Sequence, residues 1–144
     1  MISYQTVDVA MPDFDQALAT EWIKRVADSY GNRVGRITYF FCSDDKILEV
    51  NREYLTHDYY TDIITFDYTE AHCIGGELFI SLDTVRSNSQ MLGTDYATEL
   101  RRVIIHGILH LCGINDKGPG EREIMETAEN RALALLADMK AARQ

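Results

Sequence analysis

The sequence predicts an α+β domain, because strand-like segments come first along the chain and most helix-like segments come last. Four short segments are rich in β-branched and aromatic residues, and neither an internal repeat nor a linker separates them. The chain of 144 residues is 46% hydrophobic and 26% charged, which fits one globular domain with its own core. We therefore expect residues 1–144 to form a single domain with a roughly four-stranded mixed sheet and about five helices.

The strands are predicted from alternating or continuous apolar runs that turn residues bound. They are expected at 2–9, 36–42, 63–68 and 77–82. The second segment, RITYFFC, is aromatic enough to be a central strand. Gly75 and Gly76 are expected to form the turn before the fourth strand, and so short a connection would allow it to pair antiparallel with the third.

The helices are predicted from apolar stripes and from the residues that begin and end them. They are expected at 12–29, 43–55, over about eight residues from Asp83 toward Gly93, at 96–112 and at 121–141. Two helices are expected to turn a stripe of apolar residues inward. The stripe of the first helix is Phe14, Leu18, Trp22 and Val26, and that of the last includes Ile124, Ala128, Leu135 and Met139.

One stretch, VIIHGILHLCGIND at 103–116, carries the chemistry. His106 and His110 are four residues apart, so on a helix both imidazoles point the same way. Gly113 can take the left-handed conformation that ends a helix, and the turn can bring Asp116 back over the histidines. Two imidazoles and a carboxylate that leave one position open are typical of catalytic zinc sites. We expect His106, His110 and Asp116 to bind one Zn²⁺ per chain, or another divalent metal, on a centrally packed helix.

The motif has two other interpretations. A histidine on an apolar helix is often a core residue, but the other histidines, His57 and His72, show no comparable spacing. The pair also resembles the HExxH motif of zinc peptidases, in which a glutamate after the first histidine is the general base. Here that position is Gly107, which argues against a peptidase.

The net charge of −9 argues against a protein that coats nucleic acid nonspecifically. It leaves room for a local basic groove, to which Arg101, Arg102 and Lys117 could contribute. A solvated helix face is an equally good interpretation of Arg101 and Arg102.

Composition also bears on the compartment. No apolar run reaches about 18 residues, and the first residues lack the pattern of a signal peptide, so no membrane association is expected. The three cysteines are scattered, without a CxxC pair, which favours a reducing cytoplasm. Cys112 points away from the imidazole face, and we interpret it as a buried apolar residue and not as a ligand.

HGILHLCGIND resembles the signature of the YbeY family, which are bacterial rRNA maturation factors and metal-dependent endoribonucleases. Two further segments, EVNREYLTHDYYTDIITF and GELFIS, are similar to the family's conserved segments. Single residues agree as well. The matching positions are Asn51, Tyr54, Asp58, Thr61, Asp62, Phe66, Glu99, Leu100, His106, Gly107, Leu109, His110, Leu111, Gly113, Met125 and Glu129. The resemblance covers nearly the whole chain after residue 40.

Two departures from the family pattern matter, one at residues 115–116 and one at residues 55 and 60. Asp116 replaces the third histidine, and Asn115 stands where the family has aspartate. A carboxylate ligand should make bound water less acidic and favour harder metals. Tyr60 replaces a proline, and Leu55 replaces an arginine that is considered important for activity. Arg52, one turn away on the same helix face, could supply the lost phosphate contact.

The resemblance implies hydrolysis of single-stranded RNA, in maturation of the 3′ end of small-subunit rRNA and in ribosome quality control. Water on the metal would be the nucleophile, with support from Arg52, Thr61 and Asp62, although Thr61 and Asp62 equally suit a strand-opening cap. Candidate RNA contacts are Arg52, Arg101 and Lys117. The alternative is a ribosome-assembly protein that binds small-subunit proteins and has a structural metal. A zinc peptidase is the third hypothesis.

Overall fold

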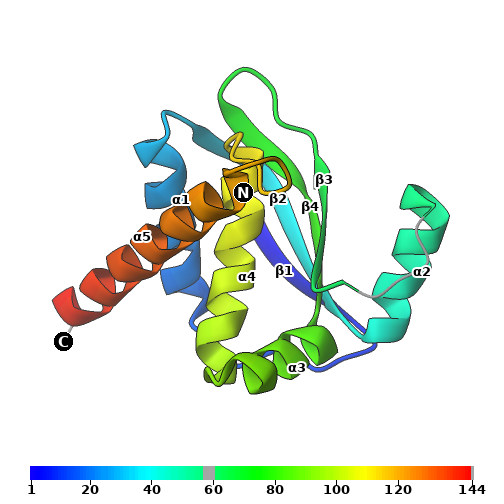
Figure 1. Ribbon diagram of the computed structural model, residues 1–144. Coiled ribbons are helices and arrows are strands. Elements are labelled where there is room, and N and C mark those ends of the chain that lie inside the picture. Colours follow the sequence, from blue (N-terminus) through cyan, green and yellow to red (C-terminus); the bar gives the residue numbers. More distant parts are fainter. Residues whose placement is uncertain (57–60, 144) are drawn as a thin grey trace.

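A computed structural model describes residues 1–56 and 61–143 of the chain. Asp58, which matches the family pattern, and Tyr60, which departs from it, lie outside these ranges. Within them the chain forms one four-stranded sheet and five helices, which confirms the predicted α+β class (Figure 1). The elements are β1 (Ile2–Val7), α1 (Gln16–Ser29), β2 (Arg33–Cys42), α2 (Asp44–Leu55), β3 (Ile63–Asp67), β4 (Cys73–Ser81), α3 (Leu82–Leu92), α4 (Tyr96–Leu111) and α5 (Glu121–Ala142).

The sheet is mixed, as predicted, with the strand order β1-β2-β4-β3. The β1–β2 and β2–β4 pairs are parallel, whereas β3 pairs antiparallel with β4. The predicted central position of β2 is also confirmed. Strand β3 has no partner on its outer side within the sheet, so its edge is available to line a cleft.

The turn predicted at Gly75 and Gly76 is wrong, because both glycines lie inside β4. The chain reverses at Ala71 and His72, whose φ angles of 45° and 63° are left-handed. A Cβ atom at Gly76 would overlap the carbonyl oxygen of Phe66 on β3. Glycine is therefore required here for close approach of two backbones, not for a turn.

Two predicted helix boundaries are also corrected. Helix α1 begins at Gln16 and not at Pro12, because the carboxylate of Asp15 caps it by accepting from the Leu18 amide at 3.0 Å. Helix α3 is longer than predicted: it spans 11 residues, begins after the N-cap Ser81 and ends at Leu92, with Gly93 as its C-cap.

The inner face predicted for α5 is partly wrong. Ile124 is 60% exposed and Leu135 is only half-buried. The buried stripe follows helical spacing from Met125, and Ile124 lies about 100° around the helix from it. The stripe consists of Met125, Ala128, Ala132, Leu136 and Met139.

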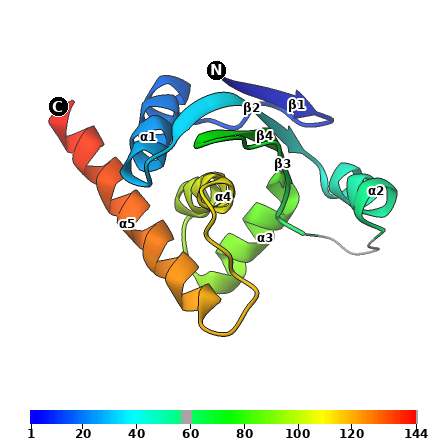
Figure 2. The same cartoon turned by 90° about the horizontal axis from the view of Figure 1, so that it is seen from above.

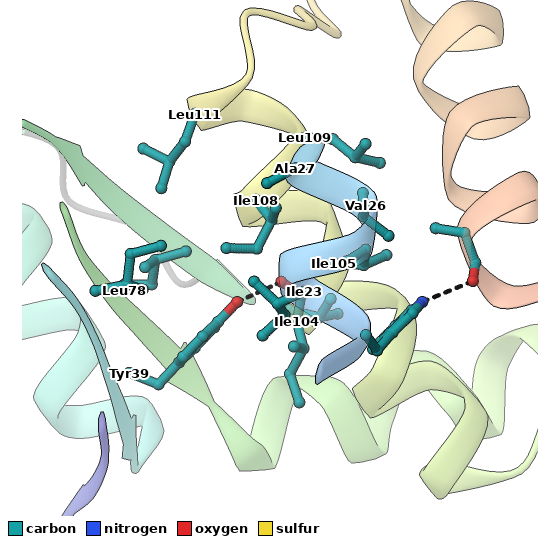
Figure 3. Packing of buried hydrophobic residues seen from close by; sticks show 14 of the residues in the cluster. Ile23, Val26, Ala27, Tyr39, Leu78, Ile104, Ile105, Ile108, Leu109 and Leu111 are labelled. Carbon is teal, nitrogen blue, oxygen red and sulfur yellow. Dashed lines mark hydrogen bonds between the residues drawn. The ribbon is translucent and has the colours of Figure 1, made fainter. Parts of the chain in front are cut away.

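Helix α4 lies in the middle of the main core, as predicted. Viewed from above, it is enclosed by the sheet, α1, α3 and α5 (Figure 2). Two buried hydrogen bonds anchor this core: the Tyr39 hydroxyl donates to the Ile104 carbonyl at 2.8 Å, and the Trp22 indole donates to the Ala132 carbonyl at 2.7 Å (Figure 3). Helix α2 covers the opposite face of the sheet, on a small cluster around Ile47 and Ile64. No helix in the described ranges is long and apolar enough to cross a membrane.

Candidate metal centre

The motif segment folds as predicted. Asp95 caps the start of α4 through the Thr98 amide at 2.8 Å. After the helix, Gly113 takes a φ of 96° and its amide donates to the His110 carbonyl at 2.9 Å. This left-handed residue reverses the chain, so that the following loop returns over the end of α4.

The reversal places Asp116 beside both histidines. Its Oδ2 lies 3.3 Å from His106 Nε2, and its Oδ1 lies 3.5 Å from His110 Nε2. The two imidazole rings meet edge-to-face, with centroids 4.8 Å apart. One ligand atom from each of the three residues lies within 4.8 Å of the others, and no other such cluster of three occurs in the described ranges. The structure thus brings together the three residues that the sequence predicted as metal ligands.

These atoms open into a cleft of about 590 Å³. The end of α2, strand β3, the last turns of α4 and the loop after α4 form its walls. Thr61, Asp62 and Lys117 line this cleft, as does Leu55, the residue that replaces the family's arginine. Burial raises the pKa of the Asp62 carboxyl above its usual range, although the nearby His106 opposes this effect.

A carboxylate from α5 supports His106 from behind. Glu129 Oε2 lies 2.7 Å from His106 Nδ1, and Glu129 Oε1 accepts from Arg102 at 2.9 Å. Burial lowers the pKa of His106, but the hydrogen bond and charge of Glu129, with the charges of Asp116 and Asp62, outweigh burial, and the net pKa is raised. His110 lacks such support: burial and the charge of His106 lower its pKa.

The arrangement fits a cation. A carboxylate can only accept, so His106 Nδ1 must carry the proton that it shares with Glu129, and a neutral His106 then presents a lone pair at Nε2. That lone pair faces the carboxylate of Asp116, which is another acceptor. Asp116 Oδ1 is buried without a hydrogen-bond partner. Converging acceptors around a buried oxygen are stabilised by a positive charge between them, which either a second proton on His106 or a bound cation supplies. Nitrogen and oxygen donors of this kind suit a divalent metal.

Gly107 leaves no room for the glutamate of a zinc peptidase. A Cβ atom there would overlap the buried Leu78 side chain and lie 3.0 Å from Ile63 Cδ1. Helix α4 packs directly on the sheet at this position, so Gly107 faces the core and not the cleft. A general base at the second position of an HExxH motif is therefore excluded by packing.

Two of the three basic residues predicted to contact RNA, Arg52 and Arg101, are not among the residues that line the cleft. Arg52 lies on α2 in a shallow hollow that it shares with Asp45, Glu49 and Glu53. Arg101 lies near the α4 N-cap, where its charge lowers the pKa of Asp95 after the stronger effect of the Thr98 hydrogen bonds. Lys117 is thus the basic side chain that the cleft contains among the described residues.

Two further expectations concern neighbouring residues. Cys112, predicted to be a buried apolar residue, is only half-buried at the C-cap of α4, and it is not among the three clustered candidate ligands. Thr61 Oγ1 lies 3.5 Å from the Ile63 carbonyl, a weak local contact at the start of β3. Sequence reasoning gave Glu129 and Arg102 no role at the metal site, because nothing in the order of residues sets the register between α4 and α5.

Fold and site together define an α+β protein with a candidate cation site of two histidines and one carboxylate. The model of the family described as Endoribonuclease YbeY matches residues 2–137. The chain belongs to this family, which confirms the resemblance found in its sequence motifs.

Similar proteins agree with this assignment. The chain is 72% identical to the Endoribonuclease YbeY of Phocaeicola vulgatus over 95% of its own length and 99% of that protein. It is 68% identical to the protein of that name from Bacteroides thetaiotaomicron, over 93% and 98% of the two chains. A solution structure from Thermotoga maritima superposes with a TM-score of 0.67 at 23% identity, covering 99% of this chain and 93% of that one. This last likeness concerns the fold alone.

Proposed function

We propose that the chain, as one hydrolase domain over residues 1–144, is a metal-dependent endoribonuclease that cuts single-stranded RNA during rRNA maturation. The processing of the 3′ end of small-subunit rRNA and ribosome quality control are its proposed settings, with precursor rRNA as the substrate and the cytoplasm as its location. The observation that carries the proposal is the convergence of His106, His110 and Asp116 in an open cleft. Membership of the endoribonuclease family supplies the substrate class.

His106, His110 and Asp116 would hold one divalent ion, and their nitrogen and oxygen donors favour Zn²⁺. When bound, the ion activates water and neutralises charge on the phosphate. Lys117, on the cleft wall, would contact a phosphate of the RNA. Thr61 and Asp62, which line the cleft just before β3, would hold the attacking water by hydrogen bonds.

Leu55 lines the cleft at the position where the family pattern has an arginine, so the cleft lacks that positive charge. The loss matters because the chain carries a net charge of −9. RNA binding in such a protein depends on few local cations. We expect Lys117→Ala to weaken RNA binding more than the removal of Arg52 or Arg101, which lie outside the cleft walls.

The test combines metal analysis with cleavage of a labelled single-stranded RNA by the wild type and a His106→Ala/His110→Ala variant. The variant should lose both bound metal and cleavage. His72→Asn is the matched control, because His72 lies in the β3–β4 turn with a left-handed φ that asparagine tolerates. Cleavage that persists undiminished in the double variant contradicts the proposal.

A second candidate function is a ribosome-assembly protein that binds small-subunit proteins around a structural metal. This assembly role is favoured over RNA binding by the acidic residues that line the cleft in addition to Asp116. They are Asp62, Asp67 and Glu121. Complementation of a strain that lacks the protein distinguishes the two. Full rescue by Asp116→Ala, together with retention of small-subunit proteins in a pull-down, supports assembly, whereas dependence on all three ligands supports catalysis.

A further inference from the structure

The two histidines of the site differ in what lies behind them. His106 Nδ1 is 2.7 Å from Glu129 Oε2, and the histidine side chain is 19% exposed. His110 is 30% exposed, and no hydrogen bond to its Nδ1 occurs within the described ranges. One imidazole is therefore fixed from behind, while the other depends on packing for its orientation.

Glu129 is itself held in place. It is 8% exposed on the face of α5 that packs against α4. Arg102, one turn before His106 on α4, donates from Nη1 to Glu129 Oε1 and from Nη2 to Asn130 Oδ1, each at 2.9 Å. Each oxygen of the buried carboxylate thus has its own donor: Arg102 occupies one and His106 the other.

Arg102 restricts what this carboxylate position can do. A guanidinium has only donors, so Arg102 needs a hydrogen-bond acceptor from residue 129. An oxygen of that side chain is therefore occupied by Arg102. A carboxylate has two oxygens and satisfies both neighbours. It therefore accepts from His106 Nδ1–H and leaves the lone pair of Nε2 pointing at Asp116.

We propose that Glu129 is a positioning residue, which Arg102 holds in place and which fixes His106 in the tautomer and orientation needed to bind the metal. The proposal rests on the metal site put forward under the proposed function. Partners of this kind behind a metal-binding imidazole set its tautomer and raise its basicity, and their loss typically weakens metal binding roughly 10–100-fold. Helix α5 would thereby contribute to a site whose ligands all come from α4 and the loop after it.

The sharpest test is Glu129→Gln. The glutamine has a single oxygen, which Arg102 claims, so its NH₂ group turns toward His106 Nδ1. The NH₂ can only donate, which favours the tautomer with the proton on Nε2, where it blocks the metal. We expect E129Q to bind Zn²⁺ roughly 10–100-fold more weakly than the wild type in competition with a chelator of known affinity.

Removal of Arg102 provides the rescue. In E129Q/R102M the glutamine can rotate and offer its oxygen to Nδ1–H, so zinc affinity should recover at least several-fold from that of E129Q. A purely structural role for the Arg102–Glu129 pair predicts the opposite, because the double variant then loses more contacts. Nitrogen NMR of labelled histidine should show the proton of His106 on Nδ1 in the wild type and on Nε2 in E129Q.

Glu126→Gln is the matched control, since Glu126 is an exposed glutamate one turn earlier on α5. It should leave the zinc affinity and the His106 tautomer unchanged, and circular dichroism should show that all variants are folded. Zinc affinity of E129Q within twofold of the wild type, or no recovery in E129Q/R102M, overturns the positioning role alone. A folded wild type that binds no Zn²⁺ overturns the proposed metal site as well.

Discussion

Gly107 of α4 lies so close to Leu78 of β4 that a Cβ atom on the glycine would overlap the leucine side chain. Leu78 is fully buried, and Ile63 closes the space from β3. The helix that carries both histidines can therefore lie directly on the sheet, and this contact sets the depth of the candidate site relative to β3.

Gly107→Ala should destabilise the protein although alanine is the better helix former. Alanine gains about 1 kcal/mol of helix propensity over glycine, whereas overpacking of a dense core costs about 1–3 kcal/mol. We expect a net loss of up to about 2 kcal/mol in the free energy of unfolding, measured in urea. Leu78→Ala should relieve the overlap, so G107A/L78A should lose less stability than the sum of its single variants. Simple additivity would refute the contact.

Asp116→Asn should separate stability from metal binding. In neutral His106 the carboxylate faces the Nε2 lone pair and leaves Oδ1 unsatisfied, whereas an asparagine NH₂ would donate to that lone pair. Metal-free D116N should therefore be more stable than the metal-free wild type by about 1 kcal/mol in urea unfolding. It should also lose the zinc-induced stabilisation, which is about 2.7 kcal/mol at a free zinc concentration 100 times the Kd.

Asp116→His is the control for this prediction, because histidine is the residue that the family pattern has at this position. It should retain stabilisation by zinc. If zinc stabilises D116N as strongly as the wild type, Asp116 is not a ligand.

Asp62→Asn should change how stability depends on pH. Burial raises the pKa of Asp62 in the folded metal-free protein above that of the unfolded chain, so ionisation favours unfolding. The cost is absent below the unfolded pKa of about 4, grows as the pH rises toward the folded pKa, and is constant above it. The stability of D62N relative to the wild type should rise with pH over this window.

Urea unfolding at several pH values between about 3 and 7 measures this trend. Asp67→Asn is the control, since Asp67 lines the same cleft but is exposed. It is the last residue of β3. A stability difference between D62N and the wild type that stays constant with pH would argue against a buried, destabilised carboxyl.

Cys42 should resist thiol reagents in the folded protein. It is fully buried, and burial raises the pKa of its thiol to about 12. At pH 8 its thiolate fraction is then on the order of 10⁻⁴, and thiolate is the reactive form. Cys73, which is half-buried, should be alkylated first, and mass spectrometry of peptides should find Cys42 labelled only after denaturation. Equal labelling of both in the native protein would contradict the burial.

Local patterns were enough to predict the class of fold, the identity of most elements and the clustering of the three candidate ligands. Helix geometry places His106 and His110 on the same face because they are four residues apart. The chain reverses at Gly113 because glycine readily adopts its φ of 96°. Local patterns failed where the backbone of another element decides. Gly75 and Gly76 suggested a turn, but they lie in β4 because neighbouring backbones approach closely, and Ile124 suggested an inner face that α5 does not turn to the core.

The sequence by itself determined that two imidazoles and a returning carboxylate would meet, since all three lie within eleven consecutive residues governed by a helix and a turn. Only the tertiary structure decided that Glu129 lies behind His106, that Leu55 and Asp62 line the cleft and that Arg52 and Arg101 lie outside its walls. The reason is physical: contacts within one helix follow from its period, whereas contacts between elements depend on how the whole core packs.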